Sequence, residues 1–306
     1  MKHCKLLFSI ALITLLAACD QSSDTAMDKK AALPADAPPP PPPGSLSVDK
    51  SPVKNTKELL TAALAGEHRS AEHRARDKYR HPVETLLFFG LKPNMTVVEL
   101  WPGGGWYTEV LAPVLHDNGR LIAAAYPANS DVEYYRKGRA AYDAKLAANP
   151  AVYGSVKVID FMPPEHGSLG PANSADMVVT FRNLHNWYSA DVLDEVFAAA
   201  YEVLKPGGIF GVTEHRAKPG TAVEDVADTG YMPAKYVITA AHKAGFQLAQ
   251  SSEINANPAD TKDYPKGVWT LPPTLALGEE NKQKYLAIGE SDRMTLKFIK
   301  PKNELK

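Results

Sequence analysis

Residues 96–108, Thr-Val-Val-Glu-Leu-Trp-Pro-Gly-Gly-Gly-Trp-Tyr-Thr, decide the fold of this chain. The apolar run Thr96–Leu100 predicts a buried strand, and an amphipathic helical pattern begins directly after the glycines. A glycine-rich turn between a first strand and a helix lets a ligand approach the backbone, although such turns also occur for tight packing alone. The dinucleotide pattern G-x-G-x-x-G is not completed, because Thr108 stands three positions beyond Gly105.

Strand and helix patterns alternate along the chain around this turn. The predicted strands are Thr96–Leu100, Arg120–Ala125, Ser155–Asp160, Ala175–Thr180, Gly208–Thr213, Gln247–Ile254 and Met294–Ile299. The predicted helices are Lys57–Ala75, His81–Phe89, Trp106–Leu115, Val132–Asn149, Ala190–Leu204 and Pro233–Ala244. This alternation predicts an α/β fold with a parallel sheet, right-handed crossovers and helices on both faces. The last two strands are more polar, so we expect them at an edge.

The glycine turn resembles motif I of class I S-adenosylmethionine (SAM)-dependent methyltransferases, in which an acidic residue precedes spaced glycines. Glu99 stands at the position of the acid, and Gly103 and Gly105 match the later two glycines. Trp101 replaces the first glycine, which the family uses for backbone clearance. The resemblance implies SAM as cofactor and a Rossmann-like, doubly wound sheet of about seven strands, mostly parallel with an antiparallel edge strand.

Two later stretches continue the resemblance. Asp160 and Phe161 follow the third predicted strand, where the family often places an acid and a neighbour that contact the adenine of SAM. Residues 204–208, Leu-Lys-Pro-Gly-Gly, match the family's turn in which the end of a helix leads into strand five. The resemblance therefore covers most of Val83 to Pro301 in order and spacing.

The second predicted strand departs from the family. A methyltransferase of this class normally holds the ribose hydroxyls through an acid after strand two, but residues 121–127 contain none. If the resemblance holds, Tyr126 would bind the ribose hydroxyls in place of the acid, or Asp131 would reach back to them.

Polar and aromatic side chains crowd residues 180–188, after the fourth predicted strand, where parallel sheets open their ligand crevice. His185 is the candidate general base, because imidazole takes up and releases protons near neutral pH. Asn183 would hold the methionine part of SAM, and Trp187 would form a wall of the substrate pocket. The alternative for His185 is a structural histidine bonded within the fold.

Glu214 and His215 follow the fifth predicted strand and should lie near the same crevice. They are the reserve catalytic residues if His185 is structural. A purely structural role is the alternative for this pair as well.

The segment 67–81 is rich in histidine and charge. His68 and His73 are five positions apart, which would place them on different faces of a helix. We therefore expect a solvated, charge-paired helix here and no metal site. An alternative is a lid over the pocket formed by Asp77, Tyr79 and Arg80.

Residues 1–18 are typical of a secretory signal peptide, with a basic start, the apolar run Leu6–Leu16 and small residues before Cys19. Leu16-Ala17-Ala18-Cys19 resembles the lipobox of bacterial lipoproteins, in which the cysteine is acylated and becomes the first residue. This predicts a cell-envelope lipoprotein held on the periplasmic side of a membrane through lipidated Cys19. An uncleaved anchor or a plain signal is the alternative.

Residues 19–56 predict a disordered tether, because they carry a proline run at 38–43 and almost no large apolar side chains. The predicted methyltransferase-like domain covers residues 57–306. Cys4 and Cys19 are the two cysteines of the chain, so this domain offers no thiol for a disulfide, a metal or a nucleophile.

The formal net charge of −1 gives no reason to expect a nucleic-acid partner. We expect SAM-dependent methyl transfer to a small-molecule or envelope acceptor. The alternative is a catalytically degenerate, ligand-binding envelope lipoprotein with this fold, because SAM is made in the cytosol and the signal exports the chain. A dehydrogenase is disfavoured, since both its pyrophosphate glycine and its ribose acid are missing.

Overall fold

The computed structural model describes residues 55–302. The predicted signal peptide at 1–18, the lipidation site Cys19 and nearly all of the tether at 19–56 lie outside the described residues. Within residues 55–302, no helix combines the length and the apolar character needed to cross a membrane.

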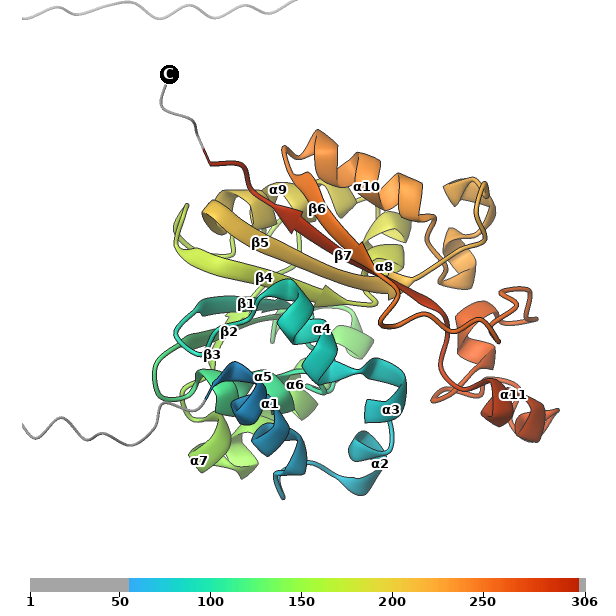
Figure 1. Cartoon of the computed structure of the whole chain (residues 1–306), viewed down its shortest axis with the longest axis horizontal. Coiled ribbons are helices and arrows are strands. Elements are labelled where there is room, and N and C mark those ends of the chain that lie inside the picture. Colours follow the sequence, from blue (N-terminus) through green and yellow to red (C-terminus); the bar gives the residue numbers. More distant parts are fainter. Residues whose placement is uncertain (1–54, 303–306) are drawn as a thin grey trace, which may run out of the picture. The chain divides into compact units, whose positions relative to one another are not determined.

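A seven-stranded sheet forms the centre of the described domain (Figure 1). The strands are β1 (Thr96–Leu100), β2 (Arg120–Ala125), β3 (Lys157–Asp160), β4 (Ala175–Phe181), β5 (Leu204–His215), β6 (Gln247–Ser252) and β7 (Arg293–Ile299). Their order is β3-β2-β1-β4-β5-β7-β6. β1 to β5 are parallel, whereas β7 is antiparallel to β5 and β6. The predicted α/β fold, a mostly parallel sheet with an antiparallel edge, is confirmed.

The central strands are apolar because both of their faces are covered. Val97 of β1 belongs to the core cluster on one face of the sheet, and its neighbour Val98 belongs to the cluster on the other. β1 pairs with β2 on one side and with β4 on the other, so the strand order reverses between β1 and β4. In open α/β sheets, ligands bind at the carboxyl ends of the strands at such a switch point.

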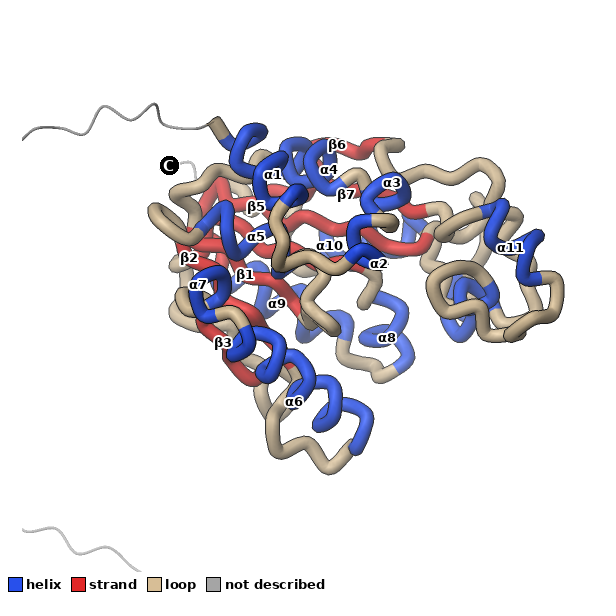
Figure 2. Tube along the Cα trace, turned by 90° about the horizontal axis from the view of Figure 1, so that it is seen from below, coloured by secondary structure: helices blue, strands red, loops and turns tan. Residues whose placement is uncertain are grey.

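Helices lie on both sides of the sheet, as expected (Figure 2). The longer ones are α1 (Thr56–Ala65), α4 (Pro82–Phe89), α5 (Thr108–Leu115), α6 (Glu133–Ala148), α9 (Leu193–Val203) and α10 (Ala234–Lys243). The shorter ones are α2 (Ala71–Arg74), α3 (Asp77–Arg80), α7 (Pro150–Tyr153), α8 (Leu184–Ser189), α11 (Lys282–Ile288) and the 3-10 turns η1 (Val223–Asp225), η2 (Ala227–Thr229) and η3 (Gly267–Thr270). α1, α4 and α5 share one apolar cluster, and α8, α9 and α10 share the other.

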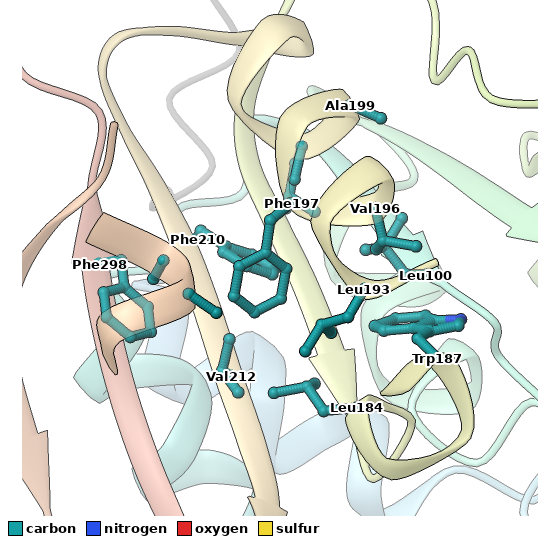
Figure 3. Packing of buried hydrophobic residues seen from close by; sticks show 14 of the residues in the cluster. Leu100, Leu184, Trp187, Leu193, Val196, Phe197, Ala199, Phe210, Val212 and Phe298 are labelled. Carbon is teal, nitrogen blue, oxygen red and sulfur yellow. The ribbon is translucent and has the colours of Figure 1, made fainter. Parts of the chain in front are cut away.

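The larger cluster packs α8 and α9 against β4 and β5 (Figure 3). Phe197 of α9 meets Phe210 of β5 edge to face, with ring centroids 5.3 Å apart, and Trp187 of α8 is completely buried. Burial of an aromatic side chain of this size stabilises the fold by about 2–3 kcal/mol. The packing of Leu184 and Trp187 fixes α8 after β4, so the polar residues next to them stay at the carboxyl end of the sheet: Arg182, Asn183, His185 and Asn186.

The predicted helix over Lys57–Ala75 is wrong, because the chain divides into α1 and α2. Gly66 adopts extended backbone (φ −62°, ψ 140°) and ends α1. A Cβ at Gly66 would lie 2.3 Å from the His68 ring, whose Nε2 contacts the carbonyl oxygen of Glu109 at 2.8 Å. This close approach needs glycine, and the contact turns the chain away from the helix axis.

The segment 67–81, expected as a solvated and charge-paired helix, is charge-paired, but it forms two short helices, α2 and α3, and two of its arginines are buried. Arg69 is buried and binds both carboxylate oxygens of Asp77 at 2.7 Å, and it also pairs with the buried Glu109. Arg80 is buried too, with 1% of its surface exposed. Arg69 and Arg80 therefore point into the domain, whereas other charged residues of the segment are exposed: Glu67, Glu72, Arg74 and Lys78.

The region 184–208 also differs in detail from the prediction. Residues 184–189 form α8, which we did not predict, and α9 covers less than the predicted Ala190–Leu204. The Leu-Lys-Pro-Gly-Gly segment belongs to β5 and not to the end of a helix, because Leu204 pairs with Ala175 of β4.

The connection between β6 and β7, residues 253–292, contains η3 and α11, neither of which was predicted. It lies at the same end of the domain as α2 and α3 in both views (Figures 1 and 2). Asp260 helps to hold it, since it accepts hydrogen bonds from the Tyr231 hydroxyl at 2.9 Å and from the backbone N–H of Asp292 at 2.7 Å. Segments from the beginning and the end of the domain's sequence thus lie near each other beside the sheet.

Candidate functional site

A pocket of about 340 Å³ lies at the carboxyl ends of β1, β2, β4 and β5. Its remaining walls come from the α2–α3 segment and from the β6–β7 connection. The predicted site residues that line it are Glu99, Gly103, Tyr126, Asn183, His185 and His215. The predicted site residues outside its lining are Gly105, Asp160, Phe161 and Glu214. Within residues 55–302, no cluster of His, Cys, Asp or Glu side chains is arranged to hold a metal ion.

The glycine turn after β1 leaves open space for a ligand. Gly103 has left-handed backbone (φ 56°), and a Cβ added at Gly103 or Gly104 would meet no atom within 4 Å. Both glycines line the pocket. Gly105 is also left-handed (φ 76°), but a Cβ there would lie 3.0 Å from the Tyr142 ring. Gly103 therefore makes room for a ligand, whereas Gly105 is required by packing within the domain.

Glu99 is buried at the end of β1 and reaches the pocket. The Thr108 hydroxyl donates a hydrogen bond to Glu99 Oε2 at 2.7 Å. Burial raises the pKa of Glu99 to about 7, although the hydrogen bond from Thr108 and the charge of Lys145 act against this rise. The side chain can therefore change its charge near neutral pH, and a cationic ligand would favour its carboxylate form.

His185 and Glu214 form a pair at the ends of β4 and β5. His185 Nδ1 lies 3.1 Å from Glu214 Oε1. Glu214 is completely buried, and it accepts hydrogen bonds from the backbone N–H groups of Leu184 (2.6 Å) and His215 (2.8 Å). These donors fix the carboxylate, which occupies Nδ1 and leaves Nε2 of the imidazole for a ligand. A histidine oriented by a buried carboxylate has the arrangement of a general base.

His215 stands beside this pair, with its ring centroid 5.6 Å from that of His185. Its Nδ1 forms a hydrogen bond with the Ser291 hydroxyl. Burial holds the pKa of His215 well below its usual range, and the charges of His185 and of nearby arginines act in the same direction. His215 is therefore neutral at physiological pH, and it lines the pocket as a polar group without charge.

Asn183 and Trp187 both stand after β4, but they lie in different surroundings. The Asn183 amide donates to the Leu100 carbonyl oxygen at 3.1 Å and to the Thr180 hydroxyl at 3.2 Å. It thus ties the end of β4 to the end of β1 and also lines the pocket. Trp187, expected as a pocket wall, is completely buried in the core behind Trp101, with ring centroids 5.4 Å apart.

The end of β3 is covered by Trp101, which has left-handed backbone (φ 44°) at the position where the family has glycine. Its indole Nε1 donates to the Phe161 carbonyl oxygen at 2.9 Å, and its ring packs against Tyr126, 4.8 Å between centroids. Phe161 is completely buried, and the Asp160 carboxylate is bound by the Arg139 guanidinium. Trp101 lines the pocket and Phe161 lies behind it, while Asp160 is engaged with Arg139 outside the pocket lining.

Sequence reasoning missed most of the remaining wall, in which Arg76, Arg182, Trp269 and Glu290 stand beside Arg80. Arg182 could have been found, because it immediately precedes Asn183 in the polar stretch after β4. The other residues come from segments whose position depends on the course of the β6–β7 connection. No local pattern marks them.

No family model matches this chain, and no curated protein matches it. Among solved structures, the [4+2]-cyclase SpnF is similar, with 18% identity over 81% of this chain and 97% of that chain, at a TM-score of 0.52. A putative sarcosine dimethylglycine methyltransferase from Galdieria sulphuraria is similar over 75% of this chain and 86% of that chain, with 12% identity and a TM-score of 0.50. A SAM-dependent methyltransferase from Aquifex aeolicus is similar over 74% and 93%, with 16% identity and a TM-score of 0.49.

These likenesses define the class of fold. The chain has the Rossmann-like α/β fold of class I SAM-dependent methyltransferases, with the seven-stranded mixed sheet described above. The same fold carries a [4+2]-cyclase as well as methyltransferases. The fold alone therefore does not determine the reaction, which depends on the side chains of the pocket.

Proposed function

We propose that this protein binds SAM in the pocket and transfers its methyl group to a small-molecule acceptor. The observation that carries the proposal is that one pocket is lined both by the open turn at Gly103 and Gly104 and by His185, whose Nδ1 is held from behind by Glu214. The turn is a cradle that a Cβ would fill, which fits a ligand lying against the backbone. The resemblance of this turn to motif I of the methyltransferase family supports a cofactor at this position.

Each part of the site has a role in this proposal. Gly103 and Gly104 would hold the cofactor, with Glu99 and Asn183 orienting it from the ends of β1 and β4. SAM supplies a methyl group already activated by its sulfonium, so the protein has mainly to align donor and acceptor. His185 would remove the proton of the acceptor, while Glu214 orients the imidazole and stabilises its positive charge.

The adenosine end of the site would differ from that of the family. Asp160 is engaged with Arg139, and Trp101 covers Phe161. Tyr126 and Tyr134 line the pocket on this side. We propose that the adenine lies against these aromatic rings and makes no contact with Asp160.

A second candidate function is ligand binding, or another reaction, on the same fold. It is favoured by the position of the Trp101 side chain, which lies against the end of β3. The methyltransferase family places the adenine of SAM there. The predicted export of the chain, away from the cytosol in which SAM is made, favours it too.

Calorimetric titration of the purified chain with SAM, its demethylated product S-adenosylhomocysteine and NAD separates these candidates. Saturable binding of SAM and of the product, together with labelled methyl transfer to a small acceptor, is expected for a methyltransferase. Binding of neither compound would overturn the methyltransferase proposal and favour the second candidate. Preferential binding of NAD would indicate a dehydrogenase.

We further propose that the domain is anchored to a membrane on the periplasmic side of the cell envelope through acylated Cys19. The support is the sequence Leu16-Ala17-Ala18-Cys19 and the proline-rich segment that follows it. Acyl chains gain about 0.8 kcal/mol for each buried methylene group, and more than one chain gives a firm anchor.

A further inference from the structure

One wall of the pocket concentrates positive charge around a single carboxylate. Arg76 Nε donates to Glu290 Oε1 at 2.6 Å, Arg80 Nε donates to Glu290 Oε2 at 3.1 Å, and Arg293 Nη1 donates to the same oxygen at 3.1 Å. Arg182 lines the pocket beside them. Four guanidinium groups therefore gather around one carboxylate, and the wall keeps an excess of positive charge.

Several nitrogen atoms of this wall lack a hydrogen-bond partner among residues 55–302, although the Arg80 guanidinium lies over the Trp106 ring. Both Nη atoms of Arg80 and Nη2 of Arg76 are buried without a hydrogen bond. Arg80 is 1% exposed and lines the pocket. A buried charged donor without a partner is costly, so these nitrogens call for an acceptor that the described residues do not supply.

The electrostatics agree with this geometry. Burial and the neighbouring charges of Arg293 and Arg76 lower the pKa of Arg182 to about 10, although Glu290 acts against them. Burial disfavours the charge of Glu290, yet the surrounding arginines hold its pKa at about 2. Glu290 thus stays ionised and accepts hydrogen bonds from three of the arginines. Its single negative charge does not balance their positive charges, so the wall can bind a second anion.

The backbone at Arg182 is strained. Its φ is 64°, the left-handed region that non-glycine residues seldom adopt. The backbone N–H of Arg182 donates to the Thr213 carbonyl oxygen at 2.8 Å, which holds this conformation against β5. Strain of this kind persists where the surrounding fold fixes it, and it is found most often at ligand sites.

We infer that Arg76, Arg80 and Arg182 form the binding site for an anionic group, a carboxylate or a phosphate, on the methyl acceptor. Guanidinium groups recognise these anions through paired hydrogen bonds. The wall is assigned to the acceptor because it adjoins His215, which stands beside the proposed base His185 with 5.6 Å between ring centroids. β7 pairs with β5 so that Arg293 stands opposite His215, and Ser291 bonds to the His215 ring. The inference rests on the proposed function only for the identity of the molecule that carries the anion.

Inorganic phosphate is the first probe, tested by thermal unfolding of the purified full chain against chloride at equal ionic strength. We expect phosphate to raise the melting temperature saturably. Arg76→Gln and Arg182→Gln should each weaken this binding by about tenfold or more, since each removes a charge-assisted hydrogen-bond donor. Arg120→Gln is the charge-matched control, because Arg120 is exposed at the amino end of β2, and it should bind phosphate like the wild type.

Glu290→Gln gives an effect of the opposite sign, which keeps the test informative if an arginine variant fails to fold. Removal of this carboxylate frees three guanidinium groups, so the stability of the variant should depend more strongly on phosphate than that of the wild type. Absence of a saturable phosphate effect in the wild type, or an equal effect in Arg182→Gln and Arg120→Gln, would overturn the anion site.

The carboxylate of the cofactor is the other possible source of the anion. S-adenosylhomocysteine carries this carboxylate, whereas methylthioadenosine does not. We expect phosphate to bind also in the presence of saturating S-adenosylhomocysteine. The arginine variants should keep their affinity for S-adenosylhomocysteine. Competition between phosphate and S-adenosylhomocysteine but not methylthioadenosine would overturn the assignment to the acceptor. If phosphate binds and neither nucleoside does, the proposed function fails while the anion site stands.

Discussion

Gly103→Ala, compared with Gly220→Ala, tests the cofactor cradle most directly. Both glycines have left-handed backbone, with φ of 56° and 81°, and a Cβ added at either would meet no atom within 4 Å. The strain of a side chain in this region, roughly 1–2 kcal/mol, is therefore common to both variants. Of the two, Gly103 lines the pocket, so its new methyl group would meet a bound cofactor.

We expect Gly103→Ala to weaken SAM binding by about 30-fold or more, because overlap with a methyl group costs about 2 kcal/mol and each 1.4 kcal/mol is a factor of ten. Gly220→Ala should bind SAM like the wild type. Gly105→Ala is a third comparison: its Cβ would lie 3.0 Å from the Tyr142 ring, so it should lose more stability than the other two variants.

The assay is calorimetric titration with SAM, with urea denaturation of each variant to measure its free energy of unfolding. Gly103→Ala and Gly220→Ala should lose similar stability and differ in affinity. Unchanged affinity in Gly103→Ala would refute the cradle. An equal loss of affinity in both variants would mean that backbone strain, and not contact with the ligand, is responsible.

Three further predictions concern the base, the buried acid and the anchor. His185→Ala should lower labelled methyl transfer by about 10²–10⁴ with little change in SAM affinity, and equal turnover would remove His185 from the mechanism. Burial raises the pKa of Glu99 from its ordinary 4.5 to about 7, so stability from its protonated form is present at low pH and is lost as pH rises through this window. Glu99→Gln should therefore exceed the wild type in unfolding free energy by up to about 3 kcal/mol at pH 8 but not at pH 4, measured by urea denaturation, and a gain of the same size at both pH values would contradict this. Cys19→Ser should release the protein from membranes, and intact mass spectrometry that finds an unmodified chain beginning at Met1 would end the lipoprotein proposal.

The sequence by itself determined the class of fold and the location of the pocket. Alternating apolar strands and helices require a parallel sheet covered on both faces, and the glycine turn at 103–105 marks where its first helix begins. Because parallel strands present their carboxyl ends at one edge, Glu99, His185 and His215 could be placed together without coordinates. These are local signals, carried by periodicity and by residues next to strand ends.

Only the tertiary structure decided which side chains complete the site. Arg80, Arg182 and Glu290 come from three segments far apart in the chain, and no local pattern records that they share one wall. The cover that Trp101 forms over β3, the pairing of Asp160 with Arg139, and the burial that shifts the pKa of Glu99 also depend on long-range packing. Charge, burial and access to a ligand are set by neighbours in space. Arg80 was expected in a solvated helix, but it is buried because Glu290 of the β6–β7 connection packs beside it.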